Sequence, residues 1–233
     1  MAHTRGADLH GLLLIDKPLG ITSFDVIRAL RRQTGVRKIG HAGTLDPLAS
    51  GLMLMLFGSA CKQAERFTKL DKRYVAQITL GANSSTGDGE GEKIPVSEAV
   101  PTLTEVEAGL VALTGDIMQT PSMYSAIKIN GKEAYKRARA GETVVMPSRQ
   151  VTIYENVLIK YDYPVIELSS KVSSGTYIRT LAEDLGKMLG TGAYLSGLVR
   201  TKVGEYALNQ AVKLDVATAE NVKRGLLRTK DHE

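Results

Sequence analysis

A glycine-rich segment, Gly40–Gly51, contains the residues of this chain that are best suited to chemistry. It lies between two apolar runs, which indicates a loop exposed where two elements end. Its glycines permit a tight or left-handed backbone and the close approach of a ligand. Asp46 is followed by Pro47, which biases the aspartate towards an extended or turn conformation. The segment predicts one carboxylate presented to a cleft, although an isolated Asp-Pro pair more often only caps a turn.

Apolar periodicity predicts the elements that position this loop. Gly11–Asp16 is a short apolar run typical of a buried strand. Thr22 with Asp25 three residues later indicates a capping box, which opens a helix that Gly35 ends. After the loop, Leu52–Phe57 predicts a strand buried on both faces.

The rest of the chain mixes helices and strands without strict alternation, and one hairpin is expected. We therefore predict an α+β fold with a mixed, mainly antiparallel sheet flanked by helices. The expected elements are a helix at about 60–70, a strand at Tyr74–Leu80, a mobile surface loop at Gly81–Gly91, a helix opened by Thr104 and Glu107, strands at Val151–Ile159 and Pro164–Ser173 joined by a hairpin turn, a helix at about 176–189, a strand at about 198–206 and a helix at about 216–227.

Composition narrows the class of protein. Hydrophobic residues are 43% of the 233 and charged residues 24%, which is typical of a globular chain. The one cysteine, Cys61, excludes an intrachain disulfide and fits a reducing compartment. The four histidines show no ligand spacing, so we expect no structural zinc. Neither a membrane-length apolar run nor a signal-peptide core is present, and we expect a cytoplasmic protein.

Basic residues gather in two stretches that follow the candidate loop in the sequence. The net charge of +5 is by itself a modest indication of an anionic partner. Lys62–Tyr74 has five basic and two acidic residues, and Lys128–Arg149 has six basic and two acidic residues. Such clusters suit a nucleic-acid backbone.

The loop is one of several motifs that, in this order, resemble the TruB family of RNA pseudouridine synthases. The resemblance covers nearly the whole chain. Its motifs are Lys17–Ser23, the His41–Gly51 signature, Lys72-x-Tyr74, Thr86–Asp88, Tyr124–Lys128, Ser174–Leu181, and Leu198–Thr201 with Gly204. It implies the pseudouridine synthase fold and an enzyme that isomerises uridine at position 55 in the T-loop of tRNA.

The resemblance also implies roles for single residues. Pseudouridine formation breaks the bond between ribose C1′ and uracil N1 and rejoins the base through C5, so no redox cofactor is expected. Asp46 is the candidate nucleophile, or a base at the ribose, and the sequence does not choose between these roles. In the family an arginine pairs with this aspartate, which assigns that role to Arg179 in place of an ordinary surface pair. We expect Arg179 to project off the buried face of its helix.

The target base must leave its stack before an enzyme can reach it, and an aromatic ring should receive it. Tyr74 resembles the family's stacking tyrosine, and we count it with Asp46 and Arg179 as catalytic. The candidate substrate-binding residues are His41 for base extrusion, Asp88 near the cleft, Tyr177 for lining the pocket or removing the C5 proton, Leu198 as apolar wall, Lys17 as a structural residue or an RNA contact, and Lys128 for gripping RNA.

The segment from about 122 to 150 differs in composition from the core elements. It is basic, low in apolar residues and rich in turn signals such as Asn130-Gly131. The family has an RNA-gripping insertion, the thumb, at this place. We expect one catalytic domain over 1–233 with this insertion. We expect no counterpart of the family's C-terminal PUA domain in this chain, either by truncation or because this is a short member.

Two other classes fit parts of the pattern. An RNA-binding or RNA-folding protein would share the basic stretches but would not need both Asp46 and Arg179. A glycosidase-like hydrolase usually needs two carboxylates, and Asp88 is a weak second. We therefore favour a stand-alone enzyme acting on the T-arm of tRNA, without an obligate protein partner and as a monomer, in contrast to relatives that use a guide RNA.

Overall fold

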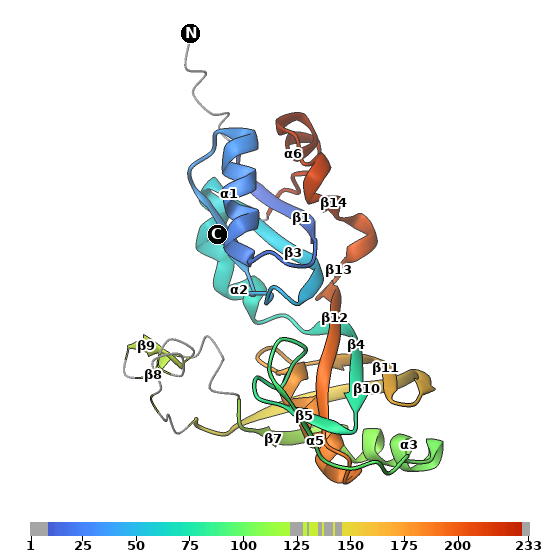
Figure 1. The fold of residues 1–233 in the computed structure, drawn as a ribbon. Coiled ribbons are helices and arrows are strands. Elements are labelled where there is room, and N and C mark those ends of the chain that lie inside the picture. The colour runs from blue at the N-terminus through green and yellow to red at the C-terminus, as the bar shows by residue number, and fades with distance from the viewer. Residues whose placement is uncertain are drawn as a thin grey trace. The chain divides into compact units, whose positions relative to one another are not determined.

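The computed structural model describes residues 9–121, 128–129, 131–134, 137, 142 and 146–229 (Figure 1). The chain divides into two compact units, and each is treated by itself. Unit 1 comprises Met1–Tyr74 and Leu198–Glu233, and unit 2 comprises Val75–Gly197. Strands β4 (Lys72–Leu80) and β12 (Ala193–Val203) contain the residues at which the chain passes from one unit to the other.

Unit 1 has a sheet with the strand order β14-β1-β3-β12. In addition, β2 pairs with β3, and β13 pairs with β12. Two of these pairings, β1 with β14 and β12 with β3, are parallel, and the others are antiparallel. The elements of the unit are β1 (Gly11–Lys17), α1 (Ser23–Thr34), β2 (Ile39–Ala42), β3 (Ala49–Phe57), the 3-10 helix η1 (Gly58–Gln63), α2 (Ala64–Thr68), β13 (Tyr206–Ala207), η2 (Leu208–Gln210), β14 (Val212–Lys213), η3 (Leu214–Val216) and α6 (Ala219–Gly225).

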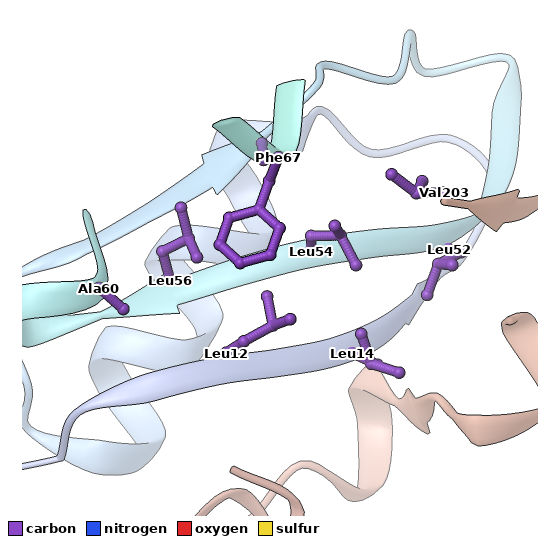
Figure 2. Close-up of a cluster of buried hydrophobic side chains, with 9 residues drawn as sticks. Leu12, Leu14, Leu52, Leu54, Leu56, Ala60, Phe67 and Val203 are labelled. Atoms are coloured by element: carbon purple, nitrogen blue, oxygen red, sulfur yellow. The ribbon is translucent and has the colours of Figure 1, made fainter. Parts of the chain in front are cut away.

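The core of unit 1 explains why β1 and β3 read as continuous apolar runs. Their antiparallel register sets Leu12 opposite Leu56 and Leu14 opposite Leu54, so these side chains share one face of the sheet. Phe67 of α2 and Ala60 of η1 cover that face, as Figure 2 shows. Met53, Met55, Leu13 and Ile15 point to the other face and are also fully buried. Both strands are therefore buried on two sides.

Helix α1 begins and ends where the sequence predicts. The Thr22 hydroxyl accepts from the Asp25 amide, the Asp25 carboxylate accepts from the Thr22 amide, and Gly35 closes the helix in the left-handed conformation. This reciprocal cap satisfies donors that the first turn cannot pair internally. The start of α1 is thus defined to the residue.

Unit 2 has the strand order β12-β4-β11-β10-β7, with α3 packed on β10 and on α5. The close approach of the two helices needs Gly109, where a Cβ would lie 2.8 Å from Leu185 Cδ1. The other elements of the unit are β5 (Ala82–Ser84), β6 (Lys93–Pro95), α3 (Leu103–Ala112), β7 (Gly115–Gln119), β8 (Lys128–Ile129), β9 (Lys132–Glu133), β10 (Arg149–Asp162), β11 (Val165–Val172) and α5 (Ile178–Met188).

The structure confirms the α+β class and the mixed, mainly antiparallel sheet. The predicted hairpin is β10–β11. Several details were wrong. The cap of α3 is Thr102 with Glu105, two residues before the predicted pair, and the single helix expected at about 60–70 is split between η1 and α2. Strands β2 and β7 were not predicted, and β12 begins at Ala193.

The segment Gly81–Gly91 was expected to be a surface loop, but part of it is buried. It contains β5 and a turn whose Asp88 is 3% exposed. Among the residues that the structure describes, none of the helices has both the length and the apolar character that crossing a bilayer requires.

Candidate active site

Asp46 lies in the loop between β2 and β3 and is exposed. The Ala49 amide donates to the Asp46 carbonyl at 3.0 Å, which makes the turn that leads into β3. The Gly20 amide donates to the Pro47 carbonyl at 2.8 Å. The backbone on either side of this carboxylate is therefore hydrogen-bonded, as a preorganised catalytic group requires.

The residue before Asp46 is fixed to the first turn of α1. The Leu45 amide donates to Ser23 Oγ at 2.9 Å, and Ser23 Oγ donates to the Leu45 carbonyl at 2.9 Å. Ser23 and Leu45 are 3% and 4% exposed. Because both polar groups of Leu45 are buried, this serine supplies bonds that water does not provide there. The cap of α1 and the position of the loop are thereby linked.

The buried side chain of Arg200, in β12, donates hydrogen bonds to the backbone of the same loop. Its side chain is almost completely buried, at 1% exposure of the residue. Nε donates to the Leu52 carbonyl at 2.7 Å, Nη2 donates to the Gly43 carbonyl at 3.1 Å, and Nη1 reaches the Thr44 carbonyl at 3.5 Å. One planar guanidinium thus ties together both flanks of the Asp46 loop. The motif Leu198–Thr201 contains Arg200 but does not predict this role, because a buried arginine that donates to carbonyls has no local sequence signature.

Two glycines make room for this arginine. Gly51 has φ +100°, and a Cβ there would lie 2.5 Å from the Arg200 carbonyl oxygen. Gly43 has φ +87°, with Arg200 Nη1 3.3 Å from its would-be Cβ. The glycines of the signature therefore serve both backbone conformation and close packing.

Two lysines are buried in the same unit as Asp46. The Lys17 ammonium has no exposed surface and donates to the carbonyls of Pro18 and Ile21 at 2.9 and 2.7 Å. Burial lowers the pKa of Lys17 to about 8, against the opposing attraction of Asp46 and with a further decrease from Arg200. Burial and Arg200 likewise lower the pKa of Lys72 to about 8. These contacts agree with a structural role for Lys17, and a direct contact with RNA stays a prediction.

His41 lies in β2, opposite Met55 of β3. Burial, with a smaller contribution from the Arg200 charge, lowers its pKa, so the imidazole is neutral at pH 7. Within the described part of the chain, its Nδ1 is buried without a hydrogen-bond partner. A buried polar atom of this kind is available to a ligand or a water molecule.

Tyr74 lies in β4 and Leu198 lies in β12, and both residues belong to unit 1, which also contains the Asp46 loop. Tyr74 is 9% exposed, at the end of the unit 1 part of β4. The Thr201 hydroxyl donates to the Arg73 carbonyl at 3.2 Å, next to that tyrosine. Leu198 is half-buried and pairs in parallel register with Ala49, three residues after Asp46. The sheet therefore brings the predicted apolar wall beside the end of the predicted catalytic loop.

Unit 2 contains the second group of predicted residues. Arg179 Nη2 is 2.7 Å from Asp88 Oδ2, and the two side chains are 10% and 5% exposed. Asp88 Oδ1 also accepts from the Thr86 hydroxyl at 2.6 Å and from the Glu90 amide at 3.1 Å. Arg179 was expected to project off the buried face of its helix, and this was wrong. The reason is that Asp88 gives the buried guanidinium an ionised partner.

The turn that carries Asp88 fits closely against α5. Gly87 has φ +74°, and a Cβ there would lie 2.9 Å from Arg179 Cδ and 2.5 Å from Glu183 Oε1. Burial raises the pKa of Glu183, which adjoins this ion pair. The glycine before Asp88 is therefore what allows the carboxylate to reach the arginine.

Tyr177, the N-cap of α5, is oriented by two neighbours. Gln119, with no exposed surface, accepts from the Tyr177 amide at 3.0 Å and donates to the Tyr177 carbonyl at 3.2 Å. The Arg149 guanidinium carbon lies 4.8 Å from the centre of the tyrosine ring. Gln119 and Arg149 were not predicted, because each acts through a residue that is distant in sequence.

The structure thus forms two groups from the predicted residues. Unit 1 contains Asp46, Lys17, His41, Tyr74 and Leu198, and unit 2 contains Asp88, Tyr177 and Arg179. The pairing of Arg179 with Asp46 stays a prediction. Lys128 lies in the short strand β8, and its side chain is outside the described residues.

Solved structures show what kind of fold this is. The chain is 24% identical to the protein in the crystal structure of a Cbf5-Nop10-Gar1 complex, with a TM-score of 0.69 over 88% of this chain and 53% of that one. A match to the crystal structure of an archaeal box H/ACA sRNP Nop10-Cbf5 complex has 22% identity and a TM-score of 0.68, covering 94% of this chain and 60% of the other. The fold is the pseudouridine synthase fold.

Sequence comparisons identify the family. Residues 31–178 match the family described as "TruB family pseudouridylate synthase (N terminal domain)". Residues 179–229 match the family described as "tRNA pseudouridylate synthase B C-terminal domain". A curated tRNA pseudouridine synthase B of Cupriavidus metallidurans is 45% identical over 96% of this chain and 73% of its own length. One of Burkholderia lata is 46% identical over 93% of this chain and 67% of its own. The chain belongs to the TruB family and is a pseudouridine synthase.

Proposed function

We propose that this enzyme converts uridine to pseudouridine at position 55, in the T-loop of tRNA. Support for tRNA as substrate comes from the relatives named tRNA pseudouridine synthase B. The observation that carries the proposal is the Asp46 loop, whose exposed aspartate sits on a backbone anchored by Ser23 and Arg200. The sequence signature of the family falls on this loop.

The reaction needs a group that acts at the ribose. Asp46 attacks C1′ or acts as a base at the ribose, so that the C1′–N1 bond breaks and the detached uracil turns. A C1′–C5 bond then forms, and this either breaks the bond between Asp46 and C1′ or is accompanied by return of the proton that Asp46 took from the ribose. The C5 proton leaves and N1 takes up a proton, so atoms and charge balance without any oxidant. The charge of the buried Lys17 interacts with that of Asp46, which raises the pKa of Lys17 against the effect of burial.

The base must be turned out of the RNA to meet this carboxylate. We assign Tyr74 to stacking on the extruded base and Leu198 to the apolar wall beside it. Support comes from the pairing of Leu198 with Ala49 at the end of the loop. His41 is neutral and has a buried ring nitrogen without a partner among the described residues, which suits a hydrogen bond with a base in the RNA loop.

Arg179 is assigned to the Asp46 carboxylate and Asp88 to holding Arg179 in place. The ion pair at 2.7 Å supports the second role, because it fixes a guanidinium that is otherwise costly to bury. Tyr177 is assigned to the pocket, either as its lining or in removal of the C5 proton. Its orientation by Gln119 supports a fixed position.

The segment from about 122 to 150 is proposed to grip the T-arm as a thumb within one catalytic domain, with Lys128 among its contacts. Its charge supports this role, while most of the segment lies outside the described residues. We further propose that the enzyme acts in the cytoplasm as a monomer, without a guide RNA or an obligate protein partner.

The test is nucleotide analysis of an unmodified tRNA transcript after incubation with the purified protein. Pseudouridine at position 55, and its loss in a transcript with cytidine at that position, is the expected result. Free uracil with an abasic site would indicate a hydrolase. Binding of the transcript with no change in its nucleotides would indicate an RNA-binding protein. Pseudouridine at another position would refute the assigned site.

A further inference from the structure

The most basic short stretch in the described part of unit 1 has no role in the function proposed above. Residues 28–38 contain five basic and no acidic residues. All five basic residues are exposed, and they are called the α1 basic surface from here on: Arg28, Arg31, Arg32, Arg37 and Lys38.

Helix α1 directs these charges away from the protein interior. Its buried residues include Val26, Ile27 and Leu30. Arg28, Arg31 and Arg32 have the spacing i, i+3 and i+4, so they share one face of the helix, and this face is opposite the buried one. The chain then turns at Gly35 and continues with two more exposed cations.

Ordinary surface electrostatics explains only part of this pattern. Cations in the last turn of a helix are stabilised by its dipole, which accounts for Arg31 and Arg32. Arg28 pairs with Asp25. Arg37 and Lys38 lie beyond the helix, and no ion pair within the described residues neutralises them. Concentrated positive charge of this kind attracts a polyanion.

The surface is joined to the candidate active loop at both of its ends. At the start of α1, Ser23 is hydrogen-bonded to Leu45, beside Asp46. From there to Arg32 the helix rises about 14 Å. At the other end, Lys38 precedes β2, which reaches His41 after about 10 Å of extended chain. An RNA bound at the loop is therefore within reach of these cations.

The surface also continues towards another basic stretch. The Gly58 amide donates to the Lys38 carbonyl at 2.9 Å, and this brings the start of η1 beside Lys38. The exposed Lys62 belongs to η1. Lys62 begins the basic stretch that the sequence already associates with a phosphate backbone.

We propose that the α1 basic surface binds the sugar-phosphate backbone of the substrate RNA, as a second grip that belongs to unit 1. Four of its five cations are arginines, whose planar guanidinium binds phosphate in a bidentate manner. Because the contacts go to phosphates, they fix the position of the RNA and do not read its sequence. The proposal rests on the proposed function for the identity of the RNA.

The experiment measures binding of an unmodified tRNA transcript at several salt concentrations. The test variant combines Arg31→Gln, Arg32→Gln and Arg37→Gln. Its control combines Lys160→Gln, Lys171→Gln and Lys187→Gln, which removes the same charge from exposed positions of unit 2. A third protein, with Arg→Lys at the three test positions, keeps the charge. Thermal melting checks that all of them are folded.

We expect the test variant to raise Kd about tenfold or more at low salt. The slope of log Kd against log salt should fall by about one unit for each phosphate that the variant no longer binds. The control and the lysine variant should keep a slope close to that of the wild type. A test variant with the wild-type slope, or a control whose affinity falls as far as that of the test variant, overturns the proposal.

The two proposals fail separately. If the wild type binds the transcript through this surface but forms no pseudouridine, the proposed function is wrong and the α1 basic surface stands. If the wild type forms pseudouridine and the test variant binds as the wild type does, the α1 basic surface is wrong and the proposed function stands.

Discussion

At the scale of single residues, the candidate site depends on a carboxylate whose neighbours bind its backbone. Asp46 is exposed, yet the residues on both sides of it donate or accept hydrogen bonds that leave the loop little freedom. A positioned group of this kind loses no entropy at the moment of reaction. Substitutions of Asp46 and of the residues that hold it should therefore act differently.

Asp46→Asn should abolish isomerisation while binding of tRNA persists, because the amide keeps the shape of the side chain and loses its charge and nucleophilicity. The measurement is a single-turnover assay on unmodified tRNA beside a binding titration. Asp215→Asn, at an exposed position of the same unit, serves as the control. Activity within about tenfold of the wild type, or roughly 1.4 kcal/mol in the barrier, would exclude the assigned role.

Arg200→Lys should lower kcat by about tenfold or more without removing the fold, because one ammonium cannot serve the Leu52 and Gly43 carbonyls in the geometry of a fork. KM should change less than kcat, since Arg200 is a positioning residue and has almost no exposed surface. Lys202→Gln, an exposed neighbour on the same strand, should behave as the wild type. A fall in melting temperature with unchanged kcat would reduce Arg200 to a structural role.

Lys17 gives a prediction about pH. Its folded pKa of about 8 lies below the ordinary value of 10.5, so the unfolded chain binds more protons between these two values. Stability contributed by this residue therefore rises with pH through that window, by at most about 1.4 kcal/mol per pH unit. Urea unfolding of the wild type and of Lys17→Met at pH 7.5, 8.5 and 9.5 should show the difference in free energy shifting in favour of the wild type. Parallel curves would contradict the depressed pKa.

At the scale of elements, the start of α1 does two things. Thr22 caps the helix, and the adjacent Ser23 holds the loop through Leu45. The two hydroxyls are neighbours in sequence, but one is exposed and the other is buried. Removing each hydroxyl in turn therefore tests two properties separately: the stability of α1 through Thr22, and the geometry of the candidate site through Ser23.

Ser23→Ala should cost about 1–3 kcal/mol, because it leaves both polar groups of Leu45 buried without a partner. It should also lower kcat several-fold. Thr22→Ala is the matched control, and loss of this N-cap should cost about 1 kcal/mol with little effect on kcat. Chemical unfolding and single-turnover rates measure the two effects. Equal rates for the two variants would show that Ser23 does not position the loop.

Elements with a strong local cause could be predicted from the sequence. The apolar runs of β1 and β3 and the capping box at Thr22 are such cases, and the structure confirms them. The start of α3 was misplaced because Thr102 with Glu105 and Thr104 with Glu107 have the same spacing, and only packing chooses between them. Strand β7 could not be predicted because its pairing with β10 is formed by residues 30 to 38 positions away.

The same distinction applies to the site. Asp46 could be predicted as a site residue because its signature is contiguous in sequence, and its role stays a prediction. The burial of Asp88 and Arg179 was not found, since each is tolerated in the interior only through the other. The role of Arg200 depends on the pairing of β12 with β3, which no local pattern of either strand contains.

At the scale of the whole molecule, binding of RNA is expected to be divided between separate basic segments. Replacing Lys128, Lys132 and Lys136 of the proposed thumb by alanine should weaken tRNA binding and lower the salt slope by about one unit for each phosphate that is no longer bound. Saturating single-turnover rates should change less than affinity. An unchanged slope would place the RNA-binding residues elsewhere.

Unit 1 consists of two stretches with the whole of unit 2 between them in sequence, and Arg200 belongs to the second stretch. At about 5–20 residues per second, a ribosome needs roughly 7–30 s to proceed from Leu52 to Arg200. During that time the nascent chain already carries Asp46 but lacks the arginine that closes its loop. The Asp46 loop can therefore be closed by Arg200 only after the whole of unit 2, with its proposed thumb, has been made.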